Sequence, residues 1–466
     1  MLTRRRFLGN TLTGVASLPL WRPTAGHLFA QAAGERPKVD DSIKVLNPRT
    51  RVPIGIIVDD STCLVNLNRF AMPQFNEAWQ GTKPVYRVDW KSWPAEIPDS
   101  FVRRFIDWAA ENDIKGKYSI VPFPACVGRL DNEVPGWSRK EIRDSIDLVR
   151  KHIMPNWDIH PEMITHTRVI DLKTGHPLTS GYTSREMENW EWTRGRSADE
   201  LTDYIAYSLQ ILKNVDLPCT GITTPGGFGK NARDNMGLAA MRATRAVMGE
   251  ELPHYFTDVE SSGNASVAPR VMLAKNLDTD SPECVVSVLG CTGDWTGGWN
   301  CVDPKGPDAF ITEDLKSGRL VDVIERGEPA MLLCHWTGVY FNGYELGFHV
   351  FQEVFKRLKQ RYDNLLSMKM SEVARYWAAK ELTRCEIANN VLKLGAPYAC
   401  DSFTVEVPAP AGELRPILVE GEKKSPLTEV TKPLELVSGT FYRNAEKQRV
   451  TLCIKLPRGA SSVSLR

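Results

Sequence analysis

The sequence predicts an α/β fold with a largely parallel sheet, followed by a small antiparallel β domain. Between about residues 50 and 380, apolar runs of strand length alternate with segments of helical periodicity. Repeated alternation of this kind is typical of a parallel sheet, either a barrel or a doubly wound sheet. Beyond about residue 386, shorter segments alternate apolar and polar residues between turns, which indicates antiparallel strands.

Each predicted strand is a short apolar run rich in β-branched residues. They cover 53–60, 117–122, 157–167, 219–224, 285–289, 330–335 and 365–370, and in the last part of the chain 403–407 and 450–456. The predicted helices have apolar residues three and four positions apart. They cover 101–112, 142–153, 231–247, 315–324 and 346–358, with one further helix capped by Ser197 and a last one capped by Ser371.

The N-terminus has the pattern of a twin-arginine signal peptide. Thr3 precedes the arginines 4–6 and Phe7-Leu8, a modest apolar stretch follows, and Ala30-Gln31-Ala32 is a small-residue cleavage site. The stretch is too short and too interrupted to span a membrane. We therefore expect residues 1–32 to direct the chain through the twin-arginine export machinery to the periplasm or the cell exterior. The expected domains are 45–385, the α/β domain, and 386–466, the β-rich domain.

Composition excludes several classes of function. The net charge of +1 gives no reason to expect nucleic acid or an anionic membrane as a partner, and no stable membrane span is evident. The ten cysteines include no CxxC pair, which excludes a zinc ribbon and a dense disulfide scaffold. Cys284, Cys291 and Cys301 are close enough in sequence to allow one disulfide, but the sequence cannot pair them.

Two adjacent carboxylates, Asp59 and Asp60, end the apolar run that begins at Pro53. Like charges this close raise each other's pKa unless a cation compensates, and a divalent metal is the commonest cation in such a place. The alternative is a polar exit from the strand in which Ser61 begins a turn. Features downstream favour the metal.

Several pieces in order resemble the motifs of the NodB-like polysaccharide deacetylases, which are metal-dependent enzymes on an irregular (β/α)7 barrel. The resemblance covers roughly residues 50–380. It is carried by the segments 57–60, 114–122, 162–167, 221–225, 294–295, 332–335 and 366–372. It implies an irregular (β/α)7-type barrel for the first domain.

The same resemblance implies catalytic roles. Asp59 is expected to be the general base that deprotonates a water molecule on the metal, and Asp60 is expected to ligate that metal. His166 is expected to be a second ligand, whose neutral imidazole suits zinc, with cobalt or nickel as alternatives. His335 is expected to protonate the leaving amine or alcohol. The metal would polarise the acyl carbonyl.

Two positions depart from the family pattern. Where the family has a second histidine, four residues after the first, this chain has Ile170, so the third ligand is open between His160, Glu162 and Asp171. We favour His160, which needs a bend near Pro161 to reach the metal; Glu162 reaches it only if the segment is helical. The arginine that orients the base is also absent.

Thr223 or Thr224 stands in the place of that arginine, and both are predicted to contact the substrate. Trp295 and Trp336 are predicted to stack on sugar rings, and Trp299 and Tyr340 are further candidates. His152 and His176, by contrast, are expected to lie on the surface.

The sequence thus predicts an exported metal-dependent hydrolase that removes acyl groups, acetyl above all, from an extracellular or cell-wall polysaccharide by cleaving amide or ester bonds. One alternative is a glycoside hydrolase, which needs two carboxylates; Asp59 or Asp60 with Glu260 or Glu283 are the formal options. The other is a glycan-binding barrel with a degraded metal site. The β-rich domain either binds carbohydrate or is a structural appendage.

Overall fold

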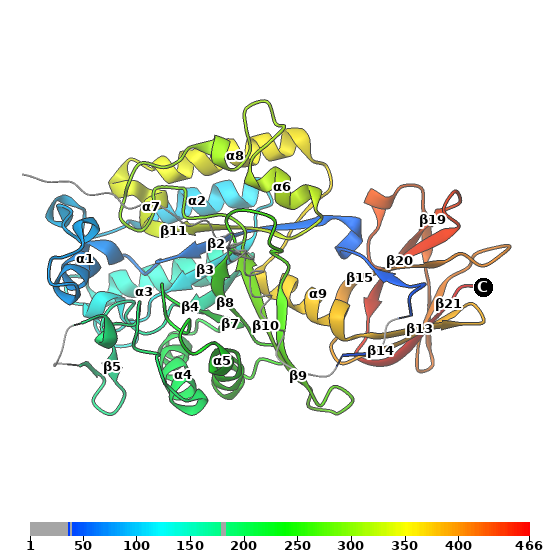
Figure 1. Ribbon diagram of the computed structural model, residues 1–466, viewed down its shortest axis with the longest axis horizontal. Coiled ribbons are helices and arrows are strands. Elements are labelled where there is room, and N and C mark those ends of the chain that lie inside the picture. The colour runs from blue at the N-terminus through cyan, green and yellow to red at the C-terminus, as the bar shows by residue number, and fades with distance from the viewer. Residues whose placement is uncertain (1–35, 38–39, 179–182) are drawn as a thin grey trace, which may run out of the picture.

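The computed structural model describes residues 36–37, 40–178 and 183–466. An α/β part forms one end of an elongated molecule, and antiparallel sheets form the other end, where the C-terminus lies (Figure 1). The predicted fold class, α/β followed by antiparallel β, is confirmed at this level. The predicted signal peptide, 1–32, lies outside the described residues.

Parallel strands form the centre of the α/β part. They are β2 (Val52–Asp59), β3 (Gly116–Ile120), β4 (Trp157–Pro161), β7 (Gly221–Thr223), β8 (His254–Val259), β10 (Glu283–Gly290) and β11 (Ala330–His335). Parallel pairing joins β11, β2, β3 and β4 in one sheet, and β7, β8 and β10 in another.

Two seams connect these sheets. A parallel bridge between Glu162 and Thr223 links the end of β4 to β7. On the other side, the amide of Cys291, just after β10, donates a 2.8 Å hydrogen bond to the carbonyl of Met331 on β11. The strands therefore follow one another around a ring, and their carboxyl ends lie at the same mouth. Strand β9 (Arg270–Lys275) lies outside the ring beside β10, and strand β12 (Leu365–Ser367) lies outside it beside β2.

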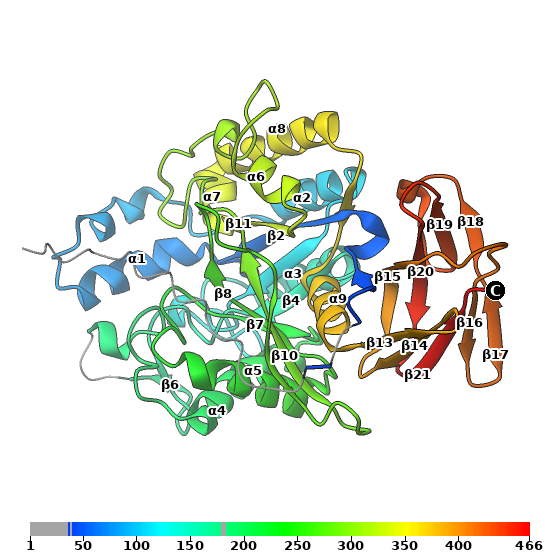
Figure 2. The ribbon, with the colours of Figure 1, turned by 45° about the vertical axis from the view of Figure 1, so that its right-hand side comes forward.

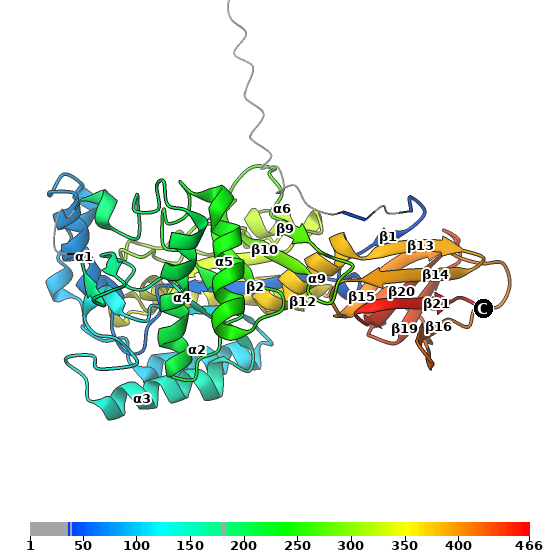
Figure 3. The ribbon, with the colours of Figure 1, turned by 90° about the horizontal axis from the view of Figure 1, so that it is seen from below.

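Helices surround the ring. They are α1 (Leu67–Ala78), α2 (Asp99–Glu111), α3 (Arg139–Leu148), α4 (Ala198–Asn214), α5 (Arg233–Met248), α6 (Arg319–Glu325), α7 (Trp336–Tyr340), α8 (Leu346–Arg361) and α9 (Met370–Leu382). Figure 2 shows α2, α6 and α8 on one side of the strands and α4 and α5 on the other. Helices α4 and α5 pack side by side (Figure 3).

The predicted helix caps have different outcomes. Ser197 caps α4 as predicted, because its hydroxyl accepts the amide of Glu200 at 3.2 Å while the Glu200 carboxylate accepts the Ser197 amide. Ser371 is not a cap. The N-cap of α9 is Lys369, and Ser371 lies in the first turn, where its hydroxyl donates to Asp158 at 2.8 Å. The predicted strand 157–167 ends at Pro161.

The antiparallel region consists of two five-stranded sheets. One contains β13 (Arg384–Ala388), β14 (Val391–Ala396), β21 (Gly459–Ser464), β16 (Ile417–Glu420) and β17 (Lys423–Pro426). The other contains β1 (Lys44–Val45), β15 (Cys400–Pro408), β20 (Arg449–Leu456), β19 (Thr440–Asn444) and β18 (Thr428–Val430). Phe403, Val405 and Val407 on β15 are fully buried, as their alternation predicts.

Helix α9 lies between the ring and these sheets (Figure 1). Tyr376 and Trp377 on α9 belong to one buried apolar cluster with residues of β8, β10 and β15. The Tyr376 hydroxyl also donates to the carbonyl of Leu46 at 2.7 Å. The two parts therefore share a core.

The cysteines, all of which lie in the described residues, are free thiols, so the disulfide that the sequence allowed among Cys284, Cys291 and Cys301 is not formed. Among the helices of the described ranges, none has the length and apolar character that crossing a membrane requires.

Candidate active site

The predicted catalytic residues meet at the mouth of the ring. Asp59 is the last residue of β2 and Asp60 follows it with φ 60°, while His335 is the last residue of β11 and is the register partner of Asp59. Glu162 follows β4 directly, and His166 lies four residues further along a bent loop. The carboxyl ends of three strands thus bring together residues that are far apart in sequence.

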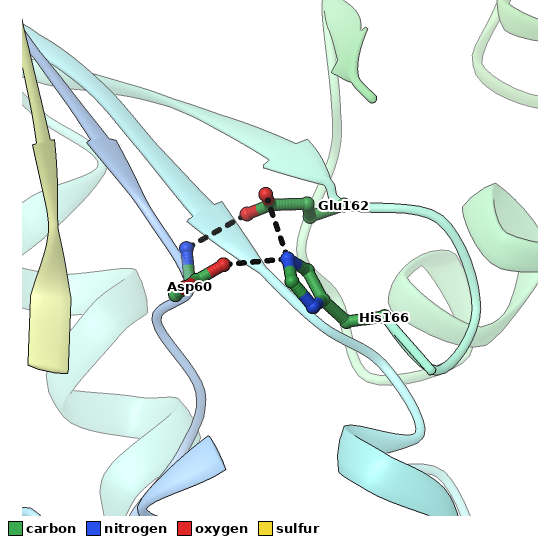
Figure 4. A group of neighbouring side chains, drawn as sticks. All are labelled: Asp60, Glu162 and His166. Atoms are coloured by element: carbon green, nitrogen blue, oxygen red, sulfur yellow. Dashed lines mark hydrogen bonds and ion pairs between the residues drawn. The ribbon is translucent and has the colours of Figure 1, made fainter. Parts of the chain in front are cut away.

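Asp60, Glu162 and His166 form a buried group whose potential ligand atoms all lie within 4.8 Å of one another. The Nε2 atom of His166 is 2.6 Å from Oδ1 of Asp60 and 3.4 Å from Oε1 of Glu162 (Figure 4). The other oxygen of Glu162 accepts hydrogen bonds from the Asp60 amide at 2.8 Å and the Ser119 hydroxyl at 2.6 Å. One oxygen of Glu162 therefore fixes its orientation, and the second faces the histidine.

This donor set fits a divalent metal ion. Apart from the contacts with His166 and His335, the buried carboxylate oxygens of Asp60 have no hydrogen-bond partner among the described residues. Burying a carboxylate in this way is costly unless a positive charge lies beside it. Burial acts to lower the pKa of His166, but Asp60 and Glu162 raise it well above its usual value. A proton on Nε2 or a metal ion supplies the positive charge that the two carboxylates require.

Glu188 holds the loop that presents His166. This fully buried carboxylate accepts the amides of Thr165 at 3.0 Å and His166 at 2.7 Å, and the hydroxyl of Tyr204 at 2.5 Å. The backbone of His166 is left-handed, with φ 64°, a conformation that such contacts must hold in place. The sequence carried no signal for Glu188.

Asp59 has a partner that the sequence analysis missed. Lys117 on β3 is fully buried, and its Nζ atom donates to the Asp59 carboxylate and, at 3.0 Å, to the carbonyl of Val58. Burial raises the pKa of Asp59 from 3.8 to about 7, although Lys117 acts to lower it. The sequence offered one signal for this pair, a lysine within a short, otherwise uncharged strand, 116–120. A charge buried in such a strand needs a partner of opposite charge.

His335 is paired with Asp294, a residue of the loop after β10. The Nδ1 atom of His335 is 2.8 Å from Oδ2 of Asp294, and its Nε2 atom is 3.9 Å from Oδ2 of Asp60. Burial acts to lower the pKa of His335, but Asp294 and Asp60 outweigh it and raise the pKa to about 10. The imidazole is therefore protonated at neutral pH and can donate a proton.

His160 is not part of the three-residue group, contrary to the expectation that it is the third ligand. Its Nε2 atom is 2.9 Å from Nε2 of His254, and its Nδ1 atom is 3.2 Å from the hydroxyl of Thr223. Both ring nitrogens are thus engaged inside the ring, where a Cβ on Gly221 would lie 2.9 Å from Nε2 of His160. Glu162 occupies the place near Asp60 through a bend and without a helix.

Several of the remaining residues that the sequence analysis named lie away from the three-residue group. Asp171 belongs to a small hairpin of β5 (Ile170–Asp171) and β6 (His176–Pro177), and its carboxylate accepts the amide of Lys173. His152 and His176 are exposed, as predicted. Glu283 begins β10 and so lies at the opposite end of the strands from Asp59, too far away for the glycosidase pairing.

Most of the residues that were predicted to contact the substrate are buried. Thr223 and Thr224 are buried, and Thr224 bonds to the hydroxyl of Thr257 at 3.1 Å. Trp336 is 1% exposed and its ring packs on those of Phe101, Phe105 and Tyr118, so it belongs to the core and cannot stack on a sugar.

Trp295 is partly exposed and packs edge-on against Phe310. Trp299 lies nearer the three-residue group. Its ring centroid is 5.9 Å from that of Phe75, which in turn is 6.5 Å from the ring of His166. Tyr86 and Trp190 also contact Phe75, so an aromatic wall stands on this side of the site.

Comparison with known proteins adds little to this geometry. No family model matches the sequence, and no curated protein matches it. The structure is similar to a probable polysaccharide deacetylase from Pseudomonas aeruginosa PAO1, at 9% identity over 59% of this chain and 72% of that chain, with a TM-score of 0.32. It is also similar to PuuE allantoinase, at 8% identity over 74% of this chain and 94% of that chain, with a TM-score of 0.36. At TM-scores this low, the similarities to these two structures carry no argument about function.

Proposed function

We propose that the protein is an exported metal-dependent hydrolase that removes acyl groups, acetyl above all, from an extracellular or cell-wall polysaccharide. The observation that carries the proposal is the buried group of Asp60, Glu162 and His166 beside a second carboxylate, Asp59, and a histidine paired with an aspartate, His335. The resemblance of the sequence motifs to NodB-like deacetylases supports the choice of substrate.

The residues divide the chemistry among themselves. Asp60, Glu162 and His166 are the residues that would hold the metal, with zinc preferred and cobalt or nickel as substitutes. When bound there, such an ion polarises the acyl carbonyl and stabilises the charge that develops on its oxygen. Asp59 accepts the proton of the attacking water.

His335 completes the proposed machinery as the general acid. Asp294 orients its ring through Nδ1, which leaves Nε2 to donate a proton to the departing amine or alcohol. Because His335 and Asp59 end neighbouring strands at the same level, the acid and the base can serve one scissile bond. The aromatic wall of Phe75, Trp190 and Trp299 offers a surface for a sugar ring beside it.

Two observations favour an enzyme over a glycan-binding barrel with a degraded site. Glu162 supplies the third donor that Ile170 cannot supply, and Lys117 supplies a cation for Asp59 where the sequence has no arginine. A degraded site has no reason to retain both. The glycosidase alternative loses Glu283, which lies at the far end of the strands.

The test begins with the metal content of the purified protein, measured by elemental analysis after native expression. The protein is then incubated with acetylated chitooligosaccharides and acetylated xylan, and released acetate is measured. We expect about one equivalent of bound metal and acetate release that a chelator abolishes. New reducing ends without acetate would identify a glycosidase. The absence of both bound metal and turnover would favour the glycan-binding barrel with a degraded metal site. The exposed His152→Ala variant serves as the control.

Export is tested separately. We expect Arg4→Lys/Arg5→Lys, which keeps the charge but removes the twin-arginine pair, to leave the protein in the cytoplasmic fraction. Recovery of this variant outside the cytoplasm in unchanged amount would contradict export by that pathway.

A further inference from the structure

Asp59 and Asp60 are adjacent in sequence but have different surroundings. Asp59 forms an ion pair with Lys117 inside the ring. The carboxylate of Asp60 instead belongs to the group with Glu162 and His166. Its Oδ1 atom is 2.6 Å from Nε2 of His166, and among the described residues its oxygens have no hydrogen-bond partner other than the histidines. A change of backbone direction separates the two side chains, because Asp60 has φ 60° whereas Asp59 is still part of β2.

Lys117 is fixed where it meets Asp59. It stands opposite Ile57 in the parallel register of β2 and β3, and its side chain has no solvent exposure. Its ammonium group is 3.0 Å from the carbonyl of Val58 and 5.5 Å from the centre of the Phe256 ring. An ammonium group is a compact charge with three donors, so it can bind this carbonyl and one carboxylate oxygen together.

The remaining neighbours do not compete for this lysine. His160 and His254 lie inside the ring and contact each other, with their Nε2 atoms 2.9 Å apart. Within the described ranges, Asp59 supplies the one carboxylate that forms an ion pair with Lys117. Lys117 and Asp59 therefore form an ion pair for which these neighbours do not compete.

We propose that Lys117 is a positioning residue that assigns different roles to the two aspartates: by holding the Asp59 carboxylate, it keeps Asp59 off the metal and leaves Asp60 as the ligand. This inference rests on the proposed metal site and goes beyond it. Without the lysine, Asp59 would be a third carboxylate at the edge of the donor group, and a divalent cation would be the nearest charge able to neutralise it.

The experiment uses cobalt as the probe, because the visible absorption of Co²⁺ changes when a ligand is added or lost. Co²⁺ is titrated into the metal-free full-length protein and into Lys117→Met, Asp59→Asn and the double variant Lys117→Met/Asp59→Asn. We expect the Asp59→Asn spectrum to match that of the unaltered protein. We expect Lys117→Met to give a changed spectrum and Co²⁺ binding at least about 10-fold tighter, because a further anionic carboxylate then joins the donor group. The double variant should restore the original spectrum, because the freed carboxylate is gone.

Two further variants control for structure. Lys117→Arg keeps a cation in the ring and should keep the original spectrum. Lys115→Met removes a partly exposed lysine just before β3, two residues from Lys117, whose Nζ atom is 3.9 Å from Glu372, and should change nothing. If Lys117→Met does not fold, the double variant and Lys117→Arg still decide: an altered spectrum in either would overturn the proposal.

The outcomes separate this inference from the proposed function. If the unaltered protein binds Co²⁺ and the Lys117→Met spectrum is identical to it, the role of Lys117 is wrong while the metal site stands. If the unaltered protein binds no divalent metal, both fail. Where acetate release is measurable, kcat should fall about 100-fold in Lys117→Met with little change in KM, since a misplaced base slows chemistry more than binding.

Discussion

His335 of β11 stands opposite Asp59 of β2 in the parallel register, so the proposed acid and the proposed base leave the sheet at the same level. Asp60 then turns away from β2 toward His166, 2.6 Å from its Nε2 atom. The three functions of the proposed hydrolase, base, ligand and acid, therefore depend on the ends of two neighbouring strands, and each can be removed by itself.

Replacing His335 by alanine should abolish the acid function without removing the metal. We expect kcat/KM for an acetylated oligosaccharide to fall on the order of 10²- to 10⁴-fold, because His335 is outside the group of three donors. Acetate release and calorimetric metal titration are the two measurements. Unchanged turnover across neutral pH would show that the acid has been assigned wrongly.

The adjacent aspartates should fail in different ways. Asp59→Asn should retain the metal and lose most hydrolytic activity, whereas Asp60→Asn should lower metal affinity first. The reason is that a lost proton acceptor slows chemistry, while a lost anionic ligand weakens binding. Metal content after dialysis distinguishes the two, and equal metal loss in both variants would mean that the roles are misassigned.

Glu162 and His160 offer a direct comparison of ligand candidates. Glu162→Gln should weaken divalent metal binding by at least about 100-fold, because one of three donors loses its charge. His160→Gln should leave metal affinity within about 3-fold, since both ring nitrogens of His160 are engaged by His254 and Thr223. Competition with a metal-binding dye measures both; the reverse order would restore His160 as the ligand.

Asp158 should make stability depend on pH away from the active site. Its carboxylate accepts hydrogen bonds from the amide and hydroxyl of Ser371, and burial nevertheless raises its pKa from 3.8 to about 6. The folded protein thus holds a proton that the unfolded chain releases. Stability from this source is full below about pH 4 and is lost as pH rises through about 6, by about 3 kcal/mol.

Urea unfolding of the unaltered protein and of Asp158→Asn, at several values between about pH 4 and 7, measures this effect. The free energy of unfolding of the unaltered protein, relative to that of the variant, should fall as the pH rises. A difference that rises or stays constant would show that the buried carboxyl is ionised throughout.

Trp336 should contribute to the stability of the fold and not to substrate binding. Because its ring is buried against Phe101, Phe105 and Tyr118, Trp336→Ala should cost about 3–5 kcal/mol of unfolding free energy. Trp336→Phe, which keeps part of the packing, should cost less. A loss below about 1 kcal/mol combined with a raised KM would revive the prediction that Trp336 stacks on a sugar.

The sequence predicted the ends of β2 and β11 well, and the site residues that depend on these two ends followed. Asp59, Asp60 and His335 come directly at the ends of apolar strands, and parallel strands around a ring place such ends at one mouth. His166 was found for a different reason, its place in a motif, since it lies on a loop that no periodicity describes.

The third donor could not be predicted, because it depends on backbone conformation after β4. Met163 and His166 both have left-handed backbones, and the bend between them brings Glu162 and His166 together without a helix. On β4 itself, His160 is committed to the interior by its contacts with His254 and Thr223. No spacing rule distinguishes these two outcomes for a histidine and a glutamate two positions apart.

The pairing of β1 with β15 has a consequence for synthesis of the chain. Lys44 pairs with Glu406 and Val45 with Val405. At ribosomal rates of about 5–20 residues per second, the roughly 360 residues between them take about 20 to 70 s to emerge. Strand β1, which precedes β2 in the chain, therefore cannot pair with β15 until nearly the whole polypeptide has been synthesised. A chain that terminates before β15 leaves the ribosome with that segment unpaired and the apolar face of α9 exposed to chaperones and proteases.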